Sequence, residues 1–395
     1  MSKIILHIDL NAFFVRCEEI KNPSLENKAV IIGHKGRGGI VSTCSYKARE
    51  YGVKSGMPMF EATKLCPNAI IISGDYPLYS TMSRTFINYV RRYATIIEQA
   101  SIDECYVDFT QQAIKIVDVE GFLKDFQKNL YKETKLSCSI GVAPTKFLAK
   151  MASDMKKPMG LTIIRRKDVH KMLDPLPIEN FYGIGKKTAP ILRKMNINTI
   201  GDLSKRIDKE DPLLKDQLGK FYFAIKDWVN GYGSDLVESA PFDPKSIGSS
   251  HTLSHDSNNY DELLENLLYL TNEVSERLNE TRKVGSTVQI TLKDDNFKTI
   301  NRSLTLKEPT NDLTIIKDSV IKLFDDNYDE NKFIRLVGVA IQNLIDPSDV
   351  HVQLSLFDDF ENIKEQCATK LLIAELNRKM KKTVFKTASE TLKDK

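Results

Sequence analysis

Residues 4–10 read Ile-Ile-Leu-His-Ile-Asp-Leu, an apolar run interrupted only by His7 and Asp9. A run of this length that is rich in β-branched residues predicts a buried strand. The run breaks at Asn11 and passes into the helical pattern of residues 13–20. We therefore expect Asp9 at the end of a buried strand, on a rigid element.

The sequence up to residue 167 alternates short strands with helices. After the first strand we predict strands at 29–32, 40–43, 96–99, 104–109 and 137–142, and helices at 46–51, 77–93, 119–134 and 144–155. The strands 96–99 and 104–109 resemble a hairpin with residues 101–103 near its bend. Such alternation indicates an α/β or α+β domain.

The rest of the chain has a helical section followed by a mixed one. Residues 168–233 show only helical patterns, with a turn at Gly183-Ile184-Gly185, and the Ser-, Pro- and Asp-rich stretch 234–245 predicts a linker. Beyond it we predict strand 247–253, helix 260–280, strands 286–293 and 298–306, helix 313–324 and strand 334–341. This β-α-β-β-α-β order predicts a small sheet with two helices on one face.

The composition excludes several classes of protein. With 395 residues, 41% of them hydrophobic, the chain is long enough for two to four domains with real cores, which excludes a disordered protein. No run approaches the roughly 18 apolar residues of a membrane span, and Asp9 interrupts the first run before a signal peptide could form, so we expect a cytoplasmic protein. The cysteines lack metal-binding spacing and are predicted to be reduced core thiols: Cys17, Cys44, Cys66, Cys105, Cys138 and Cys367.

The net charge of +4 hides a segregation of charge along the chain. Residues 146–167 carry seven Lys or Arg against one acid, and residues 183–206 carry six against one, whereas residues 98–108 contain four acids and no base. Basic tracts beside a separate acidic cluster fit a protein that grips a polyanion and holds divalent metal. A charge run taken alone is more often solvated surface.

Asp9, Asp103 and Glu104 are the candidate catalytic residues. Phosphoryl transfer to a nucleotide uses two divalent ions about 4 Å apart, and Mg²⁺ in such sites is held by carboxylates and phosphate oxygens. A strand-end Asp and an Asp-Glu pair in a neighbouring hairpin can supply such ligands. Adjacent acids are common and mostly exposed, so the argument depends on their context.

Five ordered motifs supply that context. They are His-Ile-Asp-Leu-Asn-Ala-Phe-Phe at 7–14, Ser-Tyr-Lys-Ala-Arg-Glu-Tyr-Gly-Val-Lys-Ser-Gly-Met-Pro at 45–58, Ser-Ile-Asp-Glu-Cys-Tyr-Val-Asp at 101–108, Gly-Val-Ala-Pro-Thr-Lys-Phe-Leu-Ala-Lys at 141–150 and Ala-Ser-Asp-Met-Lys-Lys-Pro at 152–158. In this order they resemble the Y-family DNA polymerases, the lesion-bypass enzymes, and most closely their DinB or DNA polymerase IV branch. The resemblance is dense over residues 1–200 and thinner from there to about residue 345.

The resemblance implies an α+β, multidomain right-hand polymerase with an additional C-terminal domain. The expected parts are a palm (1–10 and 75–167), fingers (11–74), a thumb with a helix-hairpin-helix (168–233), a linker (234–245), a βαββαβ little finger (246–345) and a tail (346–395).

The resemblance also implies roles for the acidic residues. Asp9 and Asp103 would ligate a pair of Mg²⁺ ions, for which Mn²⁺ can substitute, Glu104 would complete the ion nearest the primer 3′-hydroxyl, and the backbone carbonyl of Leu10 would touch the nucleotide-bound ion. Many DinB proteins carry a second Asp where this chain has Asn11, and UmuC-like relatives carry Asn. Because that second Asp is not a metal ligand in the family, we expect activity to survive, and the subfamily stays open.

The implied nucleotide site comprises Phe13, Phe14, Thr43, Tyr46, Arg49 and Lys157. Phe14 would be the steric gate, whose ring occupies the space that a ribose 2′-hydroxyl would need; the alternative is a core aromatic residue beside Phe13. Tyr46 and Arg49 are three residues apart and so share one face of a helix, and Arg and Lys are chemically suited to phosphate.

The remaining implied contacts are with DNA and a sliding clamp. Gly183, Gly185, Lys186 and Lys187 resemble a helix-hairpin-helix, which grips DNA phosphate without reading sequence, although a bare Gly-x-Gly is a plain helix turn in most proteins. Lys245, Ser246, Arg302 and Arg335 lie at or near strands expected to face DNA. The island Gln353-Leu354-Ser355-Leu356-Phe357 resembles the bacterial clamp-binding motif, a peptide that docks into a groove.

The sequence therefore predicts template-directed, low-fidelity DNA synthesis past damaged bases, without proofreading because the chain shows no spare exonuclease domain. The expected partners are primer–template DNA, deoxynucleoside triphosphates and the sliding clamp; we expect a monomer with no membrane contact. A catalytically inactive, DNA- and clamp-binding regulator of polymerase access and a two-metal nuclease are the competing hypotheses.

Overall fold

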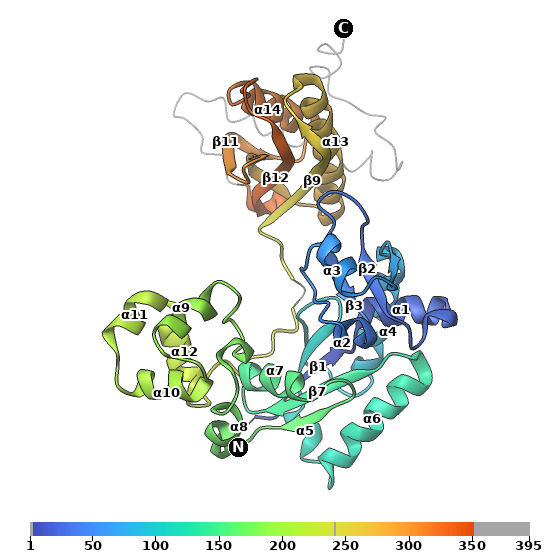
Figure 1. Cartoon of the computed structure of the whole chain (residues 1–395), viewed down its shortest axis with the longest axis vertical. Helices are drawn as coiled ribbons and strands as arrows, with labels where there is room; N and C mark the ends of the chain where they lie inside the picture. The colour runs from blue at the N-terminus through green and yellow to red at the C-terminus, as the bar shows by residue number, and fades with distance from the viewer. Residues whose placement is uncertain (1–2, 241, 351–395) are drawn as a thin grey trace. The chain divides into compact units, whose positions relative to one another are not determined.

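The computed structural model describes residues 3–240 and 242–350, which fall into two compact units divided between Phe242 and Asp243. In the first unit a five-stranded sheet has the order β5-β6-β1-β7-β8. Figure 1 labels two of its neighbouring strands, β1 and β7. Its strands are β1 (Ile5–Leu10), β5 (Ile97–Gln99), β6 (Glu104–Asp108), β7 (Cys138–Ala143) and β8 (Leu161–Ile163). β1 is antiparallel to both of its neighbours, β6 and β7.

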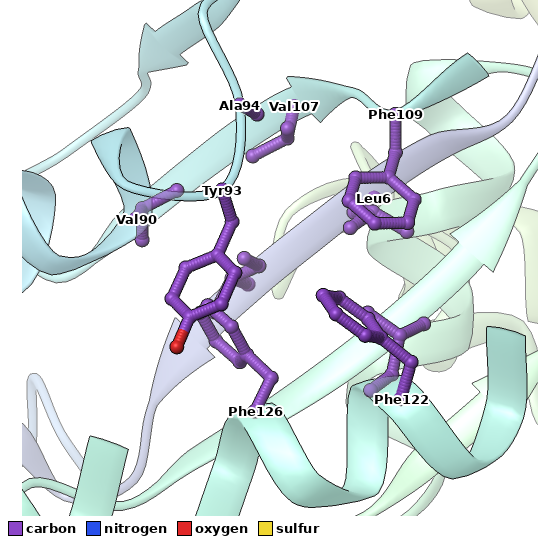
Figure 2. Close-up of a pocket in the computed structure, with 10 residues that line it drawn as sticks. Leu6, Val90, Tyr93, Ala94, Val107, Phe109, Phe122 and Phe126 are labelled. Atoms are coloured by element: carbon purple, nitrogen blue, oxygen red, sulfur yellow. The ribbon is translucent and has the colours of Figure 1, made fainter. Parts of the chain in front are cut away.

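All six residues of β1 are buried because helices cover both faces of this sheet. Leu6, Ile8 and Leu10 pack in the core shared with α4 (Tyr76–Arg91) and α6 (Val119–Thr134), and Figure 2 shows the side chains of this core pointing into a small apolar cavity. Ile5 packs in a second core, with α7 (Lys146–Met155). Successive strand residues point to opposite faces, so His7 and Asp9 lie with Ile5 on the α7 side.

A smaller sheet of order β3-β2-β4 has its own core, built around Ile31, Val41 and Met59. Its strands are β2 (Val30–Gly33), β3 (Val41–Cys44) and β4 (Ile70–Ile72), and the helices between residues 11 and 75 are α1 (Phe13–Lys21), α2 (Tyr46–Glu50) and α3 (Met59–Leu65). The sequence did not predict β4, β8 or α3, because elements of three to seven residues are too short for a clear periodic pattern.

The predicted helical section is confirmed. It contains α8 (Val169–Leu173), α9 (Thr188–Lys194), α10 (Ile200–Asp208), α11 (Pro212–Leu218) and α12 (Phe221–Val229). Outside this section there is a short helix, α5 (Thr110–Ala113). The 3₁₀ helices along the described chain are Pro23–Leu25, Arg166–Asp168, Ile178–Asn180 and Pro347–Asp349. Thr199 and Asp202 form a capping box that starts α10. Phe147 of α7 stacks on Trp228 of α12 with ring centroids 4.6 Å apart, so one core joins this section to the large sheet.

The predicted linker begins as an attached segment. The Ser234 carbonyl accepts a hydrogen bond from the Lys146 N–H at 2.9 Å, and the Glu98 carboxylate accepts one from the Glu238 N–H at 2.8 Å. Val237 is buried in the α7 core. Residues 234–238 therefore belong structurally to the first unit.

The second unit confirms the predicted β-α-β-β-α-β order. It consists of β9 (Ser246–Ser257), α13 (Tyr260–Thr281), β10 (Val284–Asp294), β11 (Thr299–Thr310), α14 (Leu313–Asp325) and β12 (Ile334–Ile345), in an antiparallel sheet of order β11-β10-β12-β9. Alternate residues such as Val288, Ile290 and Leu292 pack under the two helices.

The cysteine prediction is confirmed where it can be examined: Cys17, Cys44, Cys66, Cys105 and Cys138 are free and buried, and Cys367 lies outside the described residues. Within the described ranges, no helix has the length and apolar character to cross a membrane.

Candidate active site

A cleft at the end of β1 encloses roughly 380 Å³, a volume typical of small-ligand sites. All ten residues predicted for catalysis, metal and nucleotide line it: Asp9, Leu10, Phe13, Phe14, Thr43, Tyr46, Arg49, Asp103, Glu104 and Lys157. The other lining residues are Asn11, Ala12, Ser42 and Ser55. The structure thus brings together side chains that lie up to 148 residues apart in the sequence.

The strand register places the carboxylates. Asp9 of β1 lies directly opposite Glu104 of β6, so both side chains point to the same face. The Leu10 N–H donates to the Asp103 carbonyl at 3.0 Å, which fixes the bend before β6 beside the end of β1. The Asp103 carboxylate accepts a hydrogen bond from the Ser101 hydroxyl at 2.6 Å.

Two lysines neutralise these carboxylates. The Lys150 ammonium lies 3.1 Å from Asp9 Oδ2 and 2.5 Å from Glu104 Oε1, and the Lys157 ammonium lies 2.8 Å from Asp9 Oδ2. Sequence reasoning did not assign Lys150 to the site. The signal available was its spacing: Lys150, Asp154 and Lys157 recur at helical intervals along and just after α7, next to a predicted acidic cluster.

Burial and neighbouring charge shift the pKa values of the carboxyl groups in opposite directions. Burial, together with a hydrogen bond to the neighbouring Glu104, raises the pKa of Asp9 to about 7, although Lys157 and Lys150 oppose the shift. Burial acts in the same upward sense on Glu104, but hydrogen bonds with His7, Asp9 and Lys150 together lower the pKa of Glu104. Glu104 is therefore the firmly ionised member of the pair.

His7 is a further residue of the site that sequence reasoning did not assign. Its ring is fully buried, with Nδ1 2.8 Å from the Ser153 hydroxyl and Nε2 3.5 Å from Glu104 Oε2. Burial lowers the pKa of His7, which favours the neutral ring. Its period-two spacing from Asp9 on one strand was the available signal.

The donor set of the cleft fits hard divalent cations. Three carboxylates and a backbone carbonyl are all oxygen ligands of the kind Mg²⁺ prefers. Among the residues that the structure describes, no three acidic, His or Cys side chains already converge on one point. Positive charge is instead supplied to Asp9 and Glu104 by Lys150 and Lys157.

Phe13 and Phe14 have different environments. Both rings line the cleft, but Phe13 is buried in the core, whereas Phe14 is only partly buried. The Phe14 ring stacks on Tyr79 with centroids 4.3 Å apart and planes 10° apart. The Tyr79 hydroxyl donates to Glu18 Oε1 at 2.7 Å, which fixes the stacking partner. Phe14 also packs against the edge of the core, so its role as a steric gate stays a prediction.

Helix α2 presents side-chain groups that can bind phosphate to the cleft. Ser45 caps the helix by accepting a hydrogen bond from the Ala48 N–H at 3.2 Å. One turn on, the Arg49 guanidinium lies over the Tyr46 ring, 4.8 Å from its centroid. The Tyr46 hydroxyl is buried and has no hydrogen-bond partner within residues 3–240 and 242–350. A buried hydroxyl beside a cation is a position that an anionic ligand oxygen can satisfy.

Gly183 and Gly185 are exposed in the turn before α9, whereas Ile184 between them is buried. Gly183 has φ +95°, and a Cβ there would lie 2.7 Å from Phe221 Cζ, so this position requires glycine. Lys186 and Lys187 are exposed at the start of α9, with no ion pair to any described residue.

The residues predicted for DNA contact in the second unit do not share one face. Arg302 pairs with the fully buried Ile290 across the sheet, so it lies on the helix-covered side, where its Nε donates to Asn327 Oδ1 at 2.8 Å. Ser246 precedes the buried Ile247 and therefore points to the opposite, open face.

The other two predicted residues lie near the ends of strands. Lys245 immediately precedes β9, and its carbonyl accepts a hydrogen bond from the Leu344 N–H at 3.2 Å. The Arg335 guanidinium lies 4.9 Å from the centroid of the exposed Phe297 ring. DNA contact by these residues stays a prediction, and the clamp motif Gln353–Phe357 lies outside the described residues.

Comparison with known protein families gives three matches along the chain. Residues 8–154 match the impB/mucB/samB family, residues 166–197 match the HHH motif of the IMS family, and residues 244–356 match the impB/mucB/samB family C-terminal domain. The chain is 38% identical over 380 residues to DNA polymerase IV of Bacillus velezensis, which covers 95% of this chain and 90% of that protein.

Solved structures agree with the sequence matches. A Y-family DNA polymerase chimera of Dbh and Dpo4 superimposes with a TM-score of 0.74 at 28% identity, covering 87% of this chain and 99% of the chimera. An insertion ternary complex of Dbh DNA polymerase superimposes with a TM-score of 0.60, with the same identity and coverage.

Proposed function

The chain belongs to the impB/mucB/samB family of Y-family DNA polymerases, of the DinB or DNA polymerase IV type, and we propose that it works by two-metal-ion nucleotidyl transfer without proofreading. It is a DNA-directed DNA polymerase of the translesion class. The observation that carries the proposed mechanism is that one cleft brings three carboxylates together with an Arg, a Lys and a buried Tyr hydroxyl.

Asp9, Asp103, Glu104 and the Leu10 carbonyl would hold two Mg²⁺ ions, or Mn²⁺ in their place. When bound, such ions lower the pKa of an attacking hydroxyl and neutralise charge on a triphosphate. The protein's contribution is to hold its oxygen donors on β1 and at the start of β6, two paired strands of a buried sheet. In-line nucleotidyl transfer requires the reacting groups to be held in a fixed geometry, and donors on paired strands provide such rigid support.

The cationic side of the cleft would bind the triphosphate. Arg49 presents a planar fork that suits phosphate oxygens, Lys157 supplies a point charge, and the Tyr46 and Thr43 hydroxyls can donate hydrogen bonds. Lys157 is paired with Asp9 in the structure, so binding of the nucleotide would share this ammonium between Asp9 and the phosphates.

Phe14 would select the sugar. Its ring lines the cleft and is backed by the stacked Tyr79 ring, so it cannot retreat into the core without breaking that stack. A deoxyribose fits beside a fixed ring, whereas a 2′-hydroxyl would collide with it.

Primer–template DNA and deoxynucleoside triphosphates are the proposed substrates, in line with the ternary complex formed by Dbh. The exposed lysines of the Gly183–Gly185 turn would grip DNA phosphate. The motif at 353–357 would recruit the bacterial sliding clamp, and we propose a cytoplasmic monomer. The regulator hypothesis is not favoured, because the relatives are polymerases and the whole candidate catalytic set is present.

Primer extension by an Asp103→Ala variant tests the mechanism. We expect extension to fall by roughly 10³-fold while DNA affinity is retained, because the variant lacks one carboxylate of the cleft. Asp108→Asn is the matched control, since Asp108 lies at the far end of β6 and bonds to Thr110 outside the cleft. Full activity of Asp103→Ala would refute the assignment of Asp103. With the wild-type protein, shortening of the labelled primer would indicate a nuclease, and neither shortening nor extension would indicate a regulator.

A further inference from the structure

Asn11 is a buried residue, 4% exposed, that bonds to a turn more than 140 positions away. Its Oδ1 accepts a hydrogen bond from the Met159 N–H at 2.9 Å, and its Nδ2 donates to the Ser139 hydroxyl at 2.9 Å. A backbone N–H can only donate, so the atom of Asn11 that meets Met159 is the amide oxygen. The amide nitrogen is then left for Ser139.

The same two side chains hold two successive amides of the turn at residues 157–160. Ser139 Oγ also accepts a hydrogen bond from the Gly160 N–H at 3.3 Å. Met159 has φ +59°, a left-handed conformation that is uncommon for a residue with a side chain and costs free energy unless its surroundings enforce it. The hydrogen bond from the Met159 N–H to Asn11 Oδ1 is the contact that holds Met159 in this conformation.

Side-chain packing does little to hold this turn. The Met159 side chain is exposed, and a second hollow beside the catalytic cleft is lined by Ala12, Val15, Pro158 and Met159, together with Asn11 itself. A turn that borders a hollow on one side depends on its hydrogen bonds for its position.

Lys157 begins the turn, and its ammonium lies 2.8 Å from Asp9 Oδ2 and 2.7 Å from Asp154 Oδ1. The place of that ammonium in the cleft follows from the place of the turn. We infer that Asn11 is a positioning residue, which acts on nucleotide binding through Lys157 by fixing the turn of residues 157–160. The inference rests on the proposed role of Lys157 in binding the triphosphate.

The neutral side-chain amide of Asn11 also affects the net charge of the cleft. An Asp in place of Asn11 could still accept from the Met159 N–H, and it could accept from the Ser139 hydroxyl if that hydroxyl turned to donate. It would, however, add a carboxylate to a cleft that already holds Asp9 and Glu104. Asn11 thus fixes the turn without adding negative charge.

A double-mutant cycle tests the coupling. We expect Asn11→Leu, which has nearly the same size and no hydrogen-bonding group, to raise KM for the incoming nucleotide about tenfold with a smaller change in kcat. In a Lys157→Ala background, Asn11→Leu should raise KM no further, because residues that act through one another are not additive. Fully additive effects would overturn the inference.

Backbone amide exchange provides a second measurement that does not depend on activity. Asn11→Leu should accelerate exchange at Met159 and leave Ile140, whose N–H donates to the Gly160 carbonyl at 2.8 Å, protected. Asn11→Asp should keep Met159 protected. Unchanged protection of the Met159 amide in Asn11→Leu would refute the inference that Asn11 fixes the turn. Loss of protection at both Met159 and Ile140 would show general unfolding and would also count against the inference.

Thr162→Val is the matched control, because Thr162 is a buried residue of the adjoining β8 whose hydroxyl bonds to none of the residues that the structure describes. This variant should leave KM and Met159 exchange unchanged. If Lys157→Ala alone leaves KM unchanged, the assignment of Lys157 to the triphosphate is wrong and the inference falls with it. If Lys157→Ala raises KM and Asn11→Leu does not, only the inference is wrong.

Discussion

At the scale of single residues, the cleft is a balance between buried carboxylates and the cations that neutralise them. Asp9 and Glu104 face each other across two strands, and Lys150 bonds to both. A buried charge that loses its partner is strongly destabilising, so each member depends on the others. The acidic motifs identified the carboxylates, whereas Lys150 and His7 were recognised only from their contacts in the fold.

Removing Lys150 tests this balance. We expect Lys150→Met to lower the free energy of unfolding by about 3 kcal/mol in the presence of a chelator, because Glu104 then loses its cation and Asp9 keeps only Lys157. Millimolar Mg²⁺ should restore part of the loss by binding the folded state. Chemical denaturation with EDTA and with Mg²⁺ measures both.

Lys146→Met is the control for that experiment, since Lys146 lies on the same helix but pairs with Glu98, outside the cleft. Its loss of stability should not respond to Mg²⁺. An equal loss for Lys150→Met under both conditions would show that divalent ions do not bind at these carboxylates.

Substitution of Phe14 tests the sugar gate. We expect Phe14→Ala to reduce discrimination against ribonucleotides by about 10²-fold, because the ring that blocks the 2′-hydroxyl is gone while the strand-borne carboxylates are untouched. Single-nucleotide insertion with matched ribo- and deoxyribonucleotides measures the ratio. Phe86→Leu, in the core and outside the cleft, should keep the wild-type ratio; an unchanged ratio in Phe14→Ala would exclude the role.

At the scale of elements, hydrophobic periodicity predicted the long helices correctly but missed the shortest strands. The helix predicted at 119–134 is α6 at the same bounds, and all α-helices and strands between residues 246 and 345 were predicted in order. β4 and β8 have three residues each and were missed. The register that pairs Arg302 with Ile290 was also beyond the sequence, because one residue of slip reverses the face of every side chain.

The glycines of the exposed turn before α9 differ in what they require, and this yields a paired prediction. Gly183→Ala should destabilise the first unit by about 1–3 kcal/mol and weaken DNA binding, because it strains a positive φ and meets Phe221 at 2.7 Å. Gly185→Ala has open space around its Cβ and should change stability little. Thermal unfolding and DNA titration compare the two; equal stabilities would contradict the geometry.

At the scale of the whole molecule, the chain is two units whose boundary falls inside the predicted linker. Residues 234–238 are bonded to the first unit, so the segment that connects the units is shorter than its composition suggested. The assignment of palm, fingers and thumb boundaries stays a prediction, although the large sheet takes all its strands from the two ranges predicted for the palm.

The clamp prediction also belongs to this scale. Deleting residues 353–357 should weaken binding to the bacterial sliding clamp by about 10²-fold, because a short docking peptide concentrates its affinity in a few apolar side chains. Synthesis without the clamp should be unchanged, which makes clamp-free primer extension the internal control. Equal clamp affinity before and after the deletion would locate the contact elsewhere.

The sequence by itself determined the type and order of the longer elements, the family and ten of the fourteen residues that line the cleft. These follow from local periodicity and from motifs that can be read along the chain. Only the tertiary structure decided that Lys150 neutralises Asp9 and that Asn11 fixes the turn at Met159, contacts that span 141 and 148 positions. Their physical cause is packing between elements distant in sequence, and local pattern carries no information on which distant backbone groups will meet.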